Sequence, residues 1–310
     1  MAPMSLRRFF APALLGLIAS SVSLVAQTPM TVLPLWPTAT PEPPMTAAPE
    51  KDVTTPADNL ISGHRSARLT NVTRPTLSVY PPPAGVRNTG AAALVFPGGG
   101  YVRLAWDGEG LDTCKWLNGA GMTCLLVKYR VPYQDHYPAN PADLEDAQQA
   151  MRLSRIHATE WHVDPHRIGA VGFSAGAHLA VALSNHPEYA HVLGTPAAAE
   201  ADADINARPD FAVVIYPGYL TAPPGLATLD PAELPNSQTP PTFLLQAEDD
   251  PVHVQNSLVY YRALKDANVP AEMHIFPTGG HGFGVFPAGK PEAHWTELAT
   301  TWLHTIAILK

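Results

Sequence analysis

The stretch Arg167–Ser184 reads RIGAVGFSAGAHLAVALS, and its character changes at the middle. The first half, up to Phe173, is a short apolar run that predicts a buried strand. The second half is rich in alanine and leucine and predicts a helix that begins at Ala175. Between the two halves, Ser174 stands between glycines at a sharp turn, where close backbone leaves no room for side chains. The stretch therefore predicts a strand–turn–helix unit that presents a serine.

The same alternation of apolar strands and helices continues on both sides of this unit. Further strands are predicted at Thr76–Tyr80, Ala91–Phe96, Met122–Tyr129, Phe211–Tyr216, Thr242–Gln246 and Glu272–Phe276. Helices are predicted at Cys114–Asn118, Pro141–His157, Asn256–Ala267 and Trp295–Leu309. Strands that alternate with helices are typical of a mostly parallel sheet covered by helices. We therefore expect one α/β domain, because a split at mid-chain would cut the sheet.

Composition excludes several classes of function. The 310 residues contain 19 Lys+Arg against 27 Asp+Glu, a net charge of -8, and no basic run, which argues against nucleic-acid binding. A hydrophobic fraction of 46% supports a large core and excludes a disordered chain. Two cysteines cannot build a disulfide scaffold or an all-cysteine zinc site. We expect neither a metal nor an organic cofactor.

The N-terminal residues 1–26 have the features of a secretory signal peptide. Arg7-Arg8 precedes an apolar stretch, Phe9–Val25, that proline, glycine and serines interrupt. A single membrane anchor is the alternative, but the stretch is short for a span of about 20 residues and contains helix breakers. We expect cleavage, a secreted or periplasmic location, and no membrane association afterwards.

Residues 27–58 are dense in proline and are expected to form an arm or linker without a hydrogen-bonded ladder. This arm either tethers the domain or packs Leu33, Leu35 and Trp36 against it. The catalytic domain is expected at 59–310. An exported protein can pair Cys114 with Cys124, but both lie in elements that look buried, and we favour free, inert thiols.

Two further signals suit a serine nucleophile, which needs a base to take its proton and a carboxylate to orient that base. In chain order, Asp249-Asp250 follows one predicted strand and His281, between glycines, follows the next. Both positions lie just past strand ends, where an open α/β sheet places its site. Ser174, an aspartate and His281 therefore form a candidate catalytic triad.

The loop Pro97-Gly98-Gly99-Gly100-Tyr101 follows an early buried strand. Consecutive glycines free backbone N–H groups to face a ligand oxygen, so Gly99, Gly100 and the N–H of Ala175 can form an oxyanion hole. Neither a Walker lysine nor a G-x-G-x-x-G spacing follows, so a nucleotide site is not favoured. The aromatic residues Tyr101, Trp106 and Tyr219 are candidates for lining an acyl or sugar pocket, or are core.

These motifs resemble the α/β-hydrolase superfamily, in the branch of hormone-sensitive-lipase-like, acetyl-xylan and feruloyl-type esterases. The resemblance covers about 200 residues and is carried, in the family's order, by Pro97–Tyr101, Lys128–Arg130, Asp164–Ile168, Gly172–Leu179 and Gly279–Phe283. It implies that Ser174 attacks an ester carbonyl, that His281 is the base, and that an aspartate orients it. Pro97, where lipase-like members have histidine, looks like the carbohydrate-esterase branch.

The acid has two candidates by this resemblance. Counting from Gln246 matches the family spacing at Asp250, whereas counting back from Val252 favours Asp249. We choose Asp250.

In the family's arrangement, a further polar set ties a loop to a helix start and is expected to be structural, as is a packed His178. This set is Lys128, Arg130, Asp143, Glu145 and Asp146.

The sequence therefore predicts a secreted serine esterase that acts on small-molecule or polysaccharide esters, with short acyl groups such as acetyl on carbohydrate. A peptidase or lactonase on the same triad is the alternative. A prolyl-type peptidase normally brings a propeller or comparable gating domain, for which we see no room. A catalytically silent carbohydrate-binding protein is the third hypothesis, and the complete triad argues against it.

Overall fold

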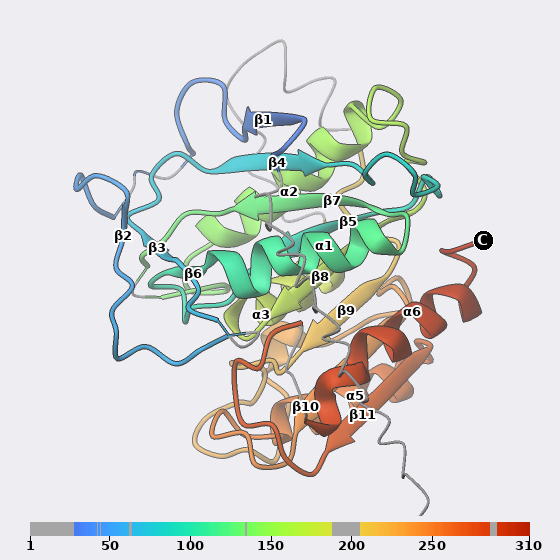
Figure 1. Cartoon of the computed structure of the whole chain (residues 1–310). Coiled ribbons are helices and arrows are strands. Elements are labelled where there is room, and N and C mark those ends of the chain that lie inside the picture. Colours follow the sequence, from blue (N-terminus) through green and yellow to red (C-terminus); the bar gives the residue numbers. More distant parts are fainter. Residues whose placement is uncertain are drawn as a thin grey trace, which may run out of the picture.

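A computed structural model describes residues 28–187 except 42, 44, 62, 63 and 134, then residues 205–285 and 290–310. Its centre is an eight-stranded sheet in the order β1-β4-β7-β5-β8-β9-β10-β11, drawn in Figure 1. The strands are β1 Thr31–Pro34, β4 Thr76–Tyr80, β5 Ala92–Phe96, β7 Thr123–Lys128, β8 Ile168–Phe173, β9 Ala212–Ile215, β10 Thr242–Ala247 and β11 Ala271–Phe276. Those from β7 to β11 run parallel, while β1 and β4 pair antiparallel at one edge. All seven predicted strands are present, and the mostly parallel sheet is confirmed.

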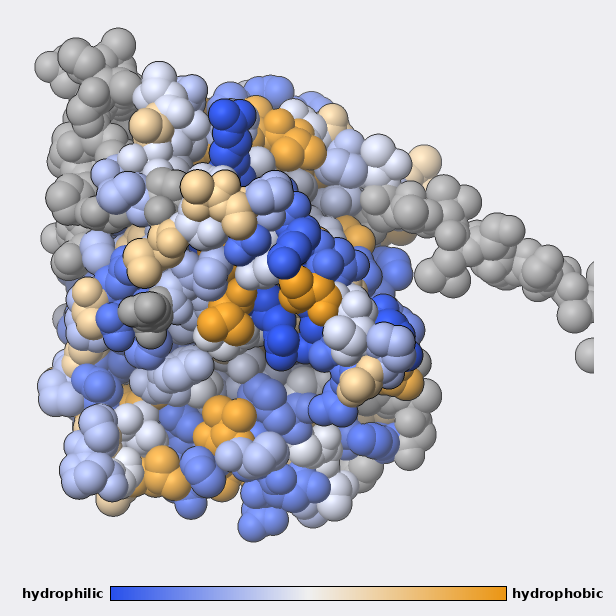
Figure 2. Space-filling view, turned by 90° about the vertical axis from the view of Figure 1, so that its left-hand side faces the viewer, coloured by the Kyte–Doolittle hydropathy of each residue, from blue (hydrophilic) through white to orange (hydrophobic). Residues whose placement is uncertain are grey.

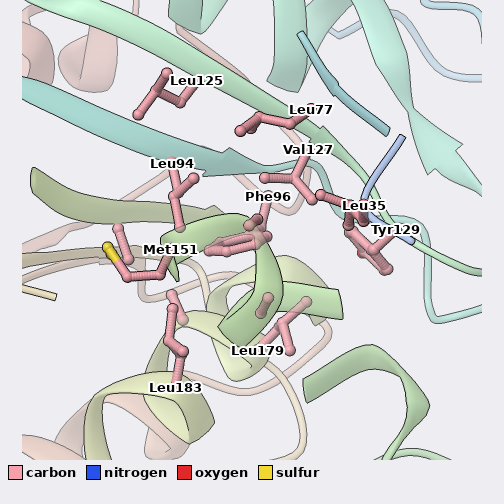
Figure 3. Packing of buried hydrophobic residues seen from close by; sticks show 14 of the residues in the cluster. Leu35, Leu77, Leu94, Phe96, Leu125, Val127, Tyr129, Met151, Leu179 and Leu183 are labelled. Atoms are coloured by element: carbon pink, nitrogen blue, oxygen red, sulfur yellow. The ribbon is translucent and has the colours of Figure 1, made fainter. Parts of the chain in front are cut away.

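Helices cover both faces of this sheet (Figure 1). They are α1 Asp112–Gly119, α2 Ala142–Ile156, α3 Ala175–Asn185, α5 Gln255–Asp266 and α6 Trp295–Thr305, with 3-10 turns at Pro231–Glu233 and Pro291–His294. Successive side chains of a strand point to opposite faces, and β5 shows the result. Leu94 and Phe96 pack towards α2 and α3, among Met151, Leu179 and Leu183 (Figure 3). Their neighbour Val95 packs on the other face, in the cluster to which α1 and α6 contribute.

The arm does not behave as predicted. Thr31–Pro34 forms the edge strand β1 on β4, so the expectation of no hydrogen-bonded ladder is wrong there. Pro34 is tolerated because it ends an edge strand, where a missing N–H costs little. Leu35 and Trp36 are buried beside it, and the Trp36 Nε1–H donates to Asp146 Oδ1 at 2.7 Å. Residues 31–36 therefore pack against the domain, while most of the rest of the arm is exposed. Lys51–Asp52, also within the arm, pairs with Leu69 and Thr70, so the expectation of no ladder is wrong there too. The expected signal peptide, 1–26, lies outside the described residues.

Asp146 is also where the polar set of α2 meets the loop after β7. The Arg130 backbone N–H and guanidinium both donate to its carboxylate, and Arg130 lies 3.2 Å from Glu145. Lys128 pairs with Glu50 at 2.9 Å. The structural role is confirmed for Arg130, Glu145 and Asp146, which tie the loop after β7 to the start of α2. Lys128 instead contacts the arm, and Asp143 Oδ2 has no hydrogen-bond partner among the described residues.

Cys114 on α1 and Cys124 on β7 form a disulfide, with their Cα atoms 5.0 Å apart. The prediction of free thiols is wrong. It relied on burial, but both side chains are buried at the same place, where α1 packs on β7. Burial therefore brought the two sulfurs together.

A second, small sheet stands at the carboxyl edge of the large one, on the left in Figure 1. It contains β2 Lys51–Asp52, β3 Arg68–Thr70 and β6 Leu104–Ala105, all antiparallel. A short π-helix, Trp106–Leu111, continues from β6 into α1. The sequence did not reveal this sheet, because its strands are too short for a periodic pattern. Among the described residues, no helix is both long enough and apolar enough to span a bilayer.

Candidate active site

Ser174 occupies a strained turn between β8 and α3. Its backbone has φ 54° and ψ -117°, which a residue other than glycine adopts only where the surroundings enforce it. The flanking glycines explain how the turn closes. A Cβ on Gly172 would lie 2.1 Å from the Gly176 carbonyl oxygen, and one on Gly176 would lie 2.0 Å from the Phe96 carbonyl oxygen. The predicted elbow is present, and its glycines are required sterically.

The structure brings the three predicted triad residues together. His281 Nε2 lies 2.8 Å from the Ser174 hydroxyl oxygen. On the other side of the ring, Nδ1 lies 3.0 and 2.9 Å from the two carboxylate oxygens of Asp250. Asp250 is buried and also accepts hydrogen bonds from the Gln246 amide and the Val252 N–H. A buried carboxylate held in this way can fix the tautomer and orientation of the imidazole.

The neighbouring Asp249 has another role. Its Oδ1 accepts the backbone N–H of Gly280 at 2.7 Å, which ties the histidine loop to the end of β10. Asp249 is exposed, whereas Asp250 faces the imidazole. The geometry therefore favours Asp250 as the orienting acid.

Gly99 and Gly100 line the same cleft as Ser174 and His281. Both have left-handed backbone, with φ 137° and 65°, which glycine adopts without strain. Ala175 begins α3, where the first N–H groups have no acceptor within the helix. Gly99 and Gly100 therefore share a cleft with Ser174, and Ala175 follows it directly, which is compatible with the predicted oxyanion hole.

Glu109 is a buried carboxyl in this site that the sequence analysis missed. It accepts the Gly98 N–H at 2.7 Å and the Tyr216 hydroxyl at 2.9 Å, and it lines the cleft. Burial raises its pKa, although these hydrogen bonds and the charge of His281 oppose the shift. Tyr216 also packs edge-on against His281, with ring centroids 5.0 Å apart. Glu109 therefore links the glycine loop to the histidine. The signal that could have revealed it is an acidic residue between two glycines, Gly108 and Gly110.

Two predicted substrate contacts lie elsewhere. Tyr101 is only 2% exposed, and its hydroxyl donates to the Ala175 carbonyl at 2.9 Å and lies 2.7 Å from His178 Nδ1. Trp106 packs, half-buried, against the core. Neither residue lines the cleft. The hydrogen bonds of Tyr101 hold its side chain away from the cleft, against α3. Tyr219 is 44% exposed, and its hydroxyl lies 3.7 Å from where a Cβ on Gly100 would stand.

His178 is packed, as expected. It is buried on α3, and its Nε2 lies 3.1 Å from Glu233. Burial opposes its charge, but Glu233 and Asp143 outweigh that effect, so its pKa is raised. This buried cluster supports the glycine loop from below, through Tyr101.

The cleft has a volume of about 310 Å³ and opens on the face that carries the small sheet. Figure 2 shows that face, with strongly hydrophilic residues beside a few hydrophobic ones near its centre. The lining residues are Asn59, Ile61, Arg68, Gly99, Gly100, Val102, Arg103, Ala105, Glu109, Ser174, His281 and Gly282. Among the described residues, no group of three His, Cys, Asp or Glu side chains could hold a metal ion. The arrangement suits a serine nucleophile with a histidine base.

Comparison with known proteins agrees with this geometry. The family model of the prolyl oligopeptidase family matches residues 140–307. An acetylxylan esterase of Xylanibacter ruminicola is 30% identical over 70% of this chain and 46% of its own length. An ethyl acetate hydrolase of Pseudomonas putida is 30% identical over 68% of this chain and 71% of its own.

A crystal structure gives similar support. The acetyl ester-xyloside bifunctional hydrolase of Caldicellulosiruptor lactoaceticus is 31% identical, with a TM-score of 0.68 over 91% of this chain and 98% of that one. The chain spans less than half the length of the Xylanibacter enzyme, and 32% of an endo-1,4-beta-xylanase of Butyrivibrio fibrisolvens that it also matches.

The fold and the serine elbow are those of the α/β-hydrolase class. Within that class it belongs to the prolyl oligopeptidase family, with esterases among its relatives. The predicted resemblance to the acetyl-xylan esterase branch is confirmed.

Proposed function

We propose that this protein hydrolyses short-chain carboxylic esters, with acetyl esters of carbohydrate as its substrates, through a Ser174–His281–Asp250 triad. The observation that carries the proposal is the continuous contact from Asp250 through His281 to the Ser174 hydroxyl at the floor of a cleft. The names of the acetylxylan esterase and the acetyl ester-xyloside hydrolase support the substrate class.

In the proposed mechanism each group has a definite role. His281 Nε2 takes the hydroxyl proton as Ser174 attacks the ester carbonyl carbon. The oxyanion that forms accepts hydrogen bonds from the N–H groups of Gly99, Gly100 and Ala175. The imidazolium, held by Asp250, then protonates the leaving alcohol, and the acyl group remains on Ser174. Water, deprotonated by the same histidine, releases the acid and restores the serine.

Residues 1–26, which lie outside the described part, are proposed to direct export. The disulfide between Cys114 and Cys124 supports this proposal, because disulfides persist mainly in oxidising compartments. Mass spectrometry of the protein from the culture medium or periplasm tests it. A mature N-terminus near residue 27 is expected, and an intact N-terminus in the cytoplasm would contradict export.

The first activity test measures hydrolysis of p-nitrophenyl acetate, butyrate and octanoate, and acetate release from acetylated xylan. We expect kcat/KM to fall as the acyl chain lengthens. Ser174→Ala should lower kcat by at least about 10⁴-fold, because it removes the nucleophile. The matched control is Ser237→Ala, an exposed serine outside the cleft, which should retain activity.

The alternative is a peptidase on the same triad, favoured by the match to the prolyl oligopeptidase family and by the similarity to an acylamino-acid-releasing enzyme of Rattus norvegicus. That protein is 30% identical over 60% of this chain and 27% of its own length. N-acetyl-alanine p-nitroanilide distinguishes the two activities. Serine-dependent cleavage of this amide faster than of any ester would overturn the esterase proposal.

A further inference from the structure

Two arginines line the cleft that contains the serine, and neither belongs to the triad or the oxyanion hole. Arg68 lies on β3 of the small sheet, and Arg103 follows the glycine loop. The backbone N–H of Arg103 donates to the Gly99 carbonyl at 3.3 Å. Its Cγ stands 3.1 Å from where a Cβ on Gly99 would lie, so the side chain starts directly against the oxyanion loop.

The guanidinium of Arg103 has an unused donor. Its Nε is buried without a hydrogen-bond partner among the described residues, and so is the Nε of Arg68 by hydrogen-bond geometry. A buried N–H without an acceptor costs free energy, about 1–3 kcal/mol for a typical group. Glu109 accepts the Gly98 N–H and the Tyr216 hydroxyl, and neither arginine Nε is hydrogen-bonded to it.

The two arginines share one counter-charge. Arg68 Nε lies 3.3 Å from Asp58 Oδ1, and its Nη2 donates to the Asn59 carbonyl at 3.3 Å. The pKa of Asp58 is lowered first by the backbone N–H of Thr55, and further by the positive charges of Arg68 and Arg103. Arg68 also acts on the buried carboxyl of Glu109, but among the described residues no carboxylate is hydrogen-bonded to the Nε of Arg103.

We propose that Arg103, assisted by Arg68, binds a carboxylate on the alcohol part of the ester, so that the substrates are acetyl esters of acidic sugars such as uronic-acid-containing saccharides. A guanidinium presents paired N–H donors that match a carboxylate entering from the cleft. The carboxylate belongs on the alcohol, because an acetyl group has none. This inference rests on the proposed ester hydrolysis and adds a charge preference to it.

The test compares 4-acetoxybenzoate with its neutral methyl ester, methyl 4-acetoxybenzoate, at low ionic strength. Both release acetate, and only one carries a carboxylate on the alcohol part. The readout is the acidic-to-neutral ratio of kcat/KM, because the ratio of a variant to wild type cancels the difference in leaving group. Arg103→Gln should lower this ratio about 10-fold or more, the range of one hydrogen bond to a charged group.

Three comparisons make the result specific. Arg103→Lys should restore part of the ratio, since it keeps the charge without the fork. Arg87→Gln, an exposed arginine in the loop before β5 and outside the cleft, should leave the ratio at its wild-type value. Raising the salt concentration should lower the wild-type ratio, because screening weakens the attraction of partly exposed charges.

The two proposals fail in different ways. Serine-dependent hydrolysis with an unchanged ratio in Arg103→Gln would overturn the carboxylate site and leave the esterase standing. If Arg103→Gln lowered kcat/KM only for mono-4-nitrophenyl succinate, whose carboxylate is on the acyl part, the placement of the carboxylate on the alcohol part would be wrong. Calorimetric titration of the Ser174→Ala protein with methyl glucuronide and methyl xyloside needs no turnover. The Ser174→Ala protein and the same protein with Arg103→Gln are compared. If each bound methyl glucuronide and methyl xyloside equally well, the carboxylate site would be overturned even if no ester were hydrolysed.

Discussion

Two adjacent aspartates in the loop just after β10 have different roles. Asp250 is buried and contacts His281, whereas Asp249 is exposed and holds the Gly280 N–H. An Asn at 250 cannot accept the imidazole N–H as a charged group, and in a triad of the same geometry on an unrelated fold this change lowers kcat by about 10⁴-fold. We therefore expect a loss of about 10³-fold or more for Asp250→Asn and less than about 10-fold for Asp249→Asn, measured as kcat on p-nitrophenyl acetate.

The Asp249 variant is the matched control, since it changes the same charge one residue away. Comparable losses in both variants, or a larger loss at 249, would contradict the assignment of Asp250. Circular dichroism of both proteins separates a loss of orientation from a loss of fold.

The sequence predicted the active-site residues that stand in a recognisable local motif. It missed the residues that only the folding of distant segments brings next to the serine. Ser174 and His281 stand in glycine-flanked positions after strands, which a single chain reveals. Glu109 and Arg103 act through contacts with the glycine loop that no local pattern encodes. Tyr101 follows the same loop but turns inward, because buried acceptors on α3 capture its hydroxyl.

At the scale of elements, the disulfide fastens α1 to β7 across a short connection of sequence separation 10. A cross-link that closes a loop of this size restricts the unfolded chain by roughly 3 kcal/mol in the chain-entropy description. The double variant Cys114→Ala, Cys124→Ala should therefore lower the free energy of unfolding by about that amount, measured by urea denaturation. The triad lies on other elements, so kcat at low temperature should change little.

Reductant provides the control for this prediction. Dithiothreitol should destabilise the wild-type protein by a similar amount and leave the double variant unaffected. If reduced and oxidised wild-type protein unfold at the same urea concentration, the predicted contribution of the cross-link is wrong.

Strands of four or more residues in apolar runs could be predicted from the sequence, whereas strands of two or three residues could not. The parallel strands are continuous apolar runs bounded by glycine and proline, so each appears in the sequence. Strands β2, β3 and β6 have two or three residues each and depend on one another for their hydrogen bonds. Strand β1 was hidden by its prolines, although the apolar pair Leu35 and Trp36 after it indicated burial.

For the whole molecule, stability should depend on pH through buried carboxyls. Asp143 is buried, its Oδ2 has no hydrogen-bond partner among the described residues, and burial raises its pKa from 3.8 to about 6. A group with a raised pKa in the folded state favours folding below its unfolded pKa, and this contribution is lost as pH rises through about 6. The raised pKa of His178 acts in the same direction. Stability should therefore fall between about pH 4 and pH 7.5 from these groups.

Asp143→Asn tests this expectation. The amide keeps an oxygen for the Leu144 N–H and has no charge to desolvate. Relative to wild type, its free energy of unfolding should rise by up to roughly 3 kcal/mol between pH 4 and pH 7.5, measured by urea denaturation. Asp266→Asn, an exposed residue on α5, is the control and should show little relative change. Parallel pH curves for Asp143→Asn and wild type would contradict the raised pKa.

The residues of the cleft come from two different parts of the fold. Nucleophile, base and acid sit on loops fixed by the large sheet, whereas Asn59, Ile61 and Arg68 of the cleft come from the segment that leads into and forms β3. That segment is joined to the rest of the molecule by hydrogen bonds to β6 and to the π-helix and by the contact of His64 with Asp112, and it contributes none of the triad. Substitutions in this N-terminal segment can therefore reshape one wall of the cleft without replacing any triad residue.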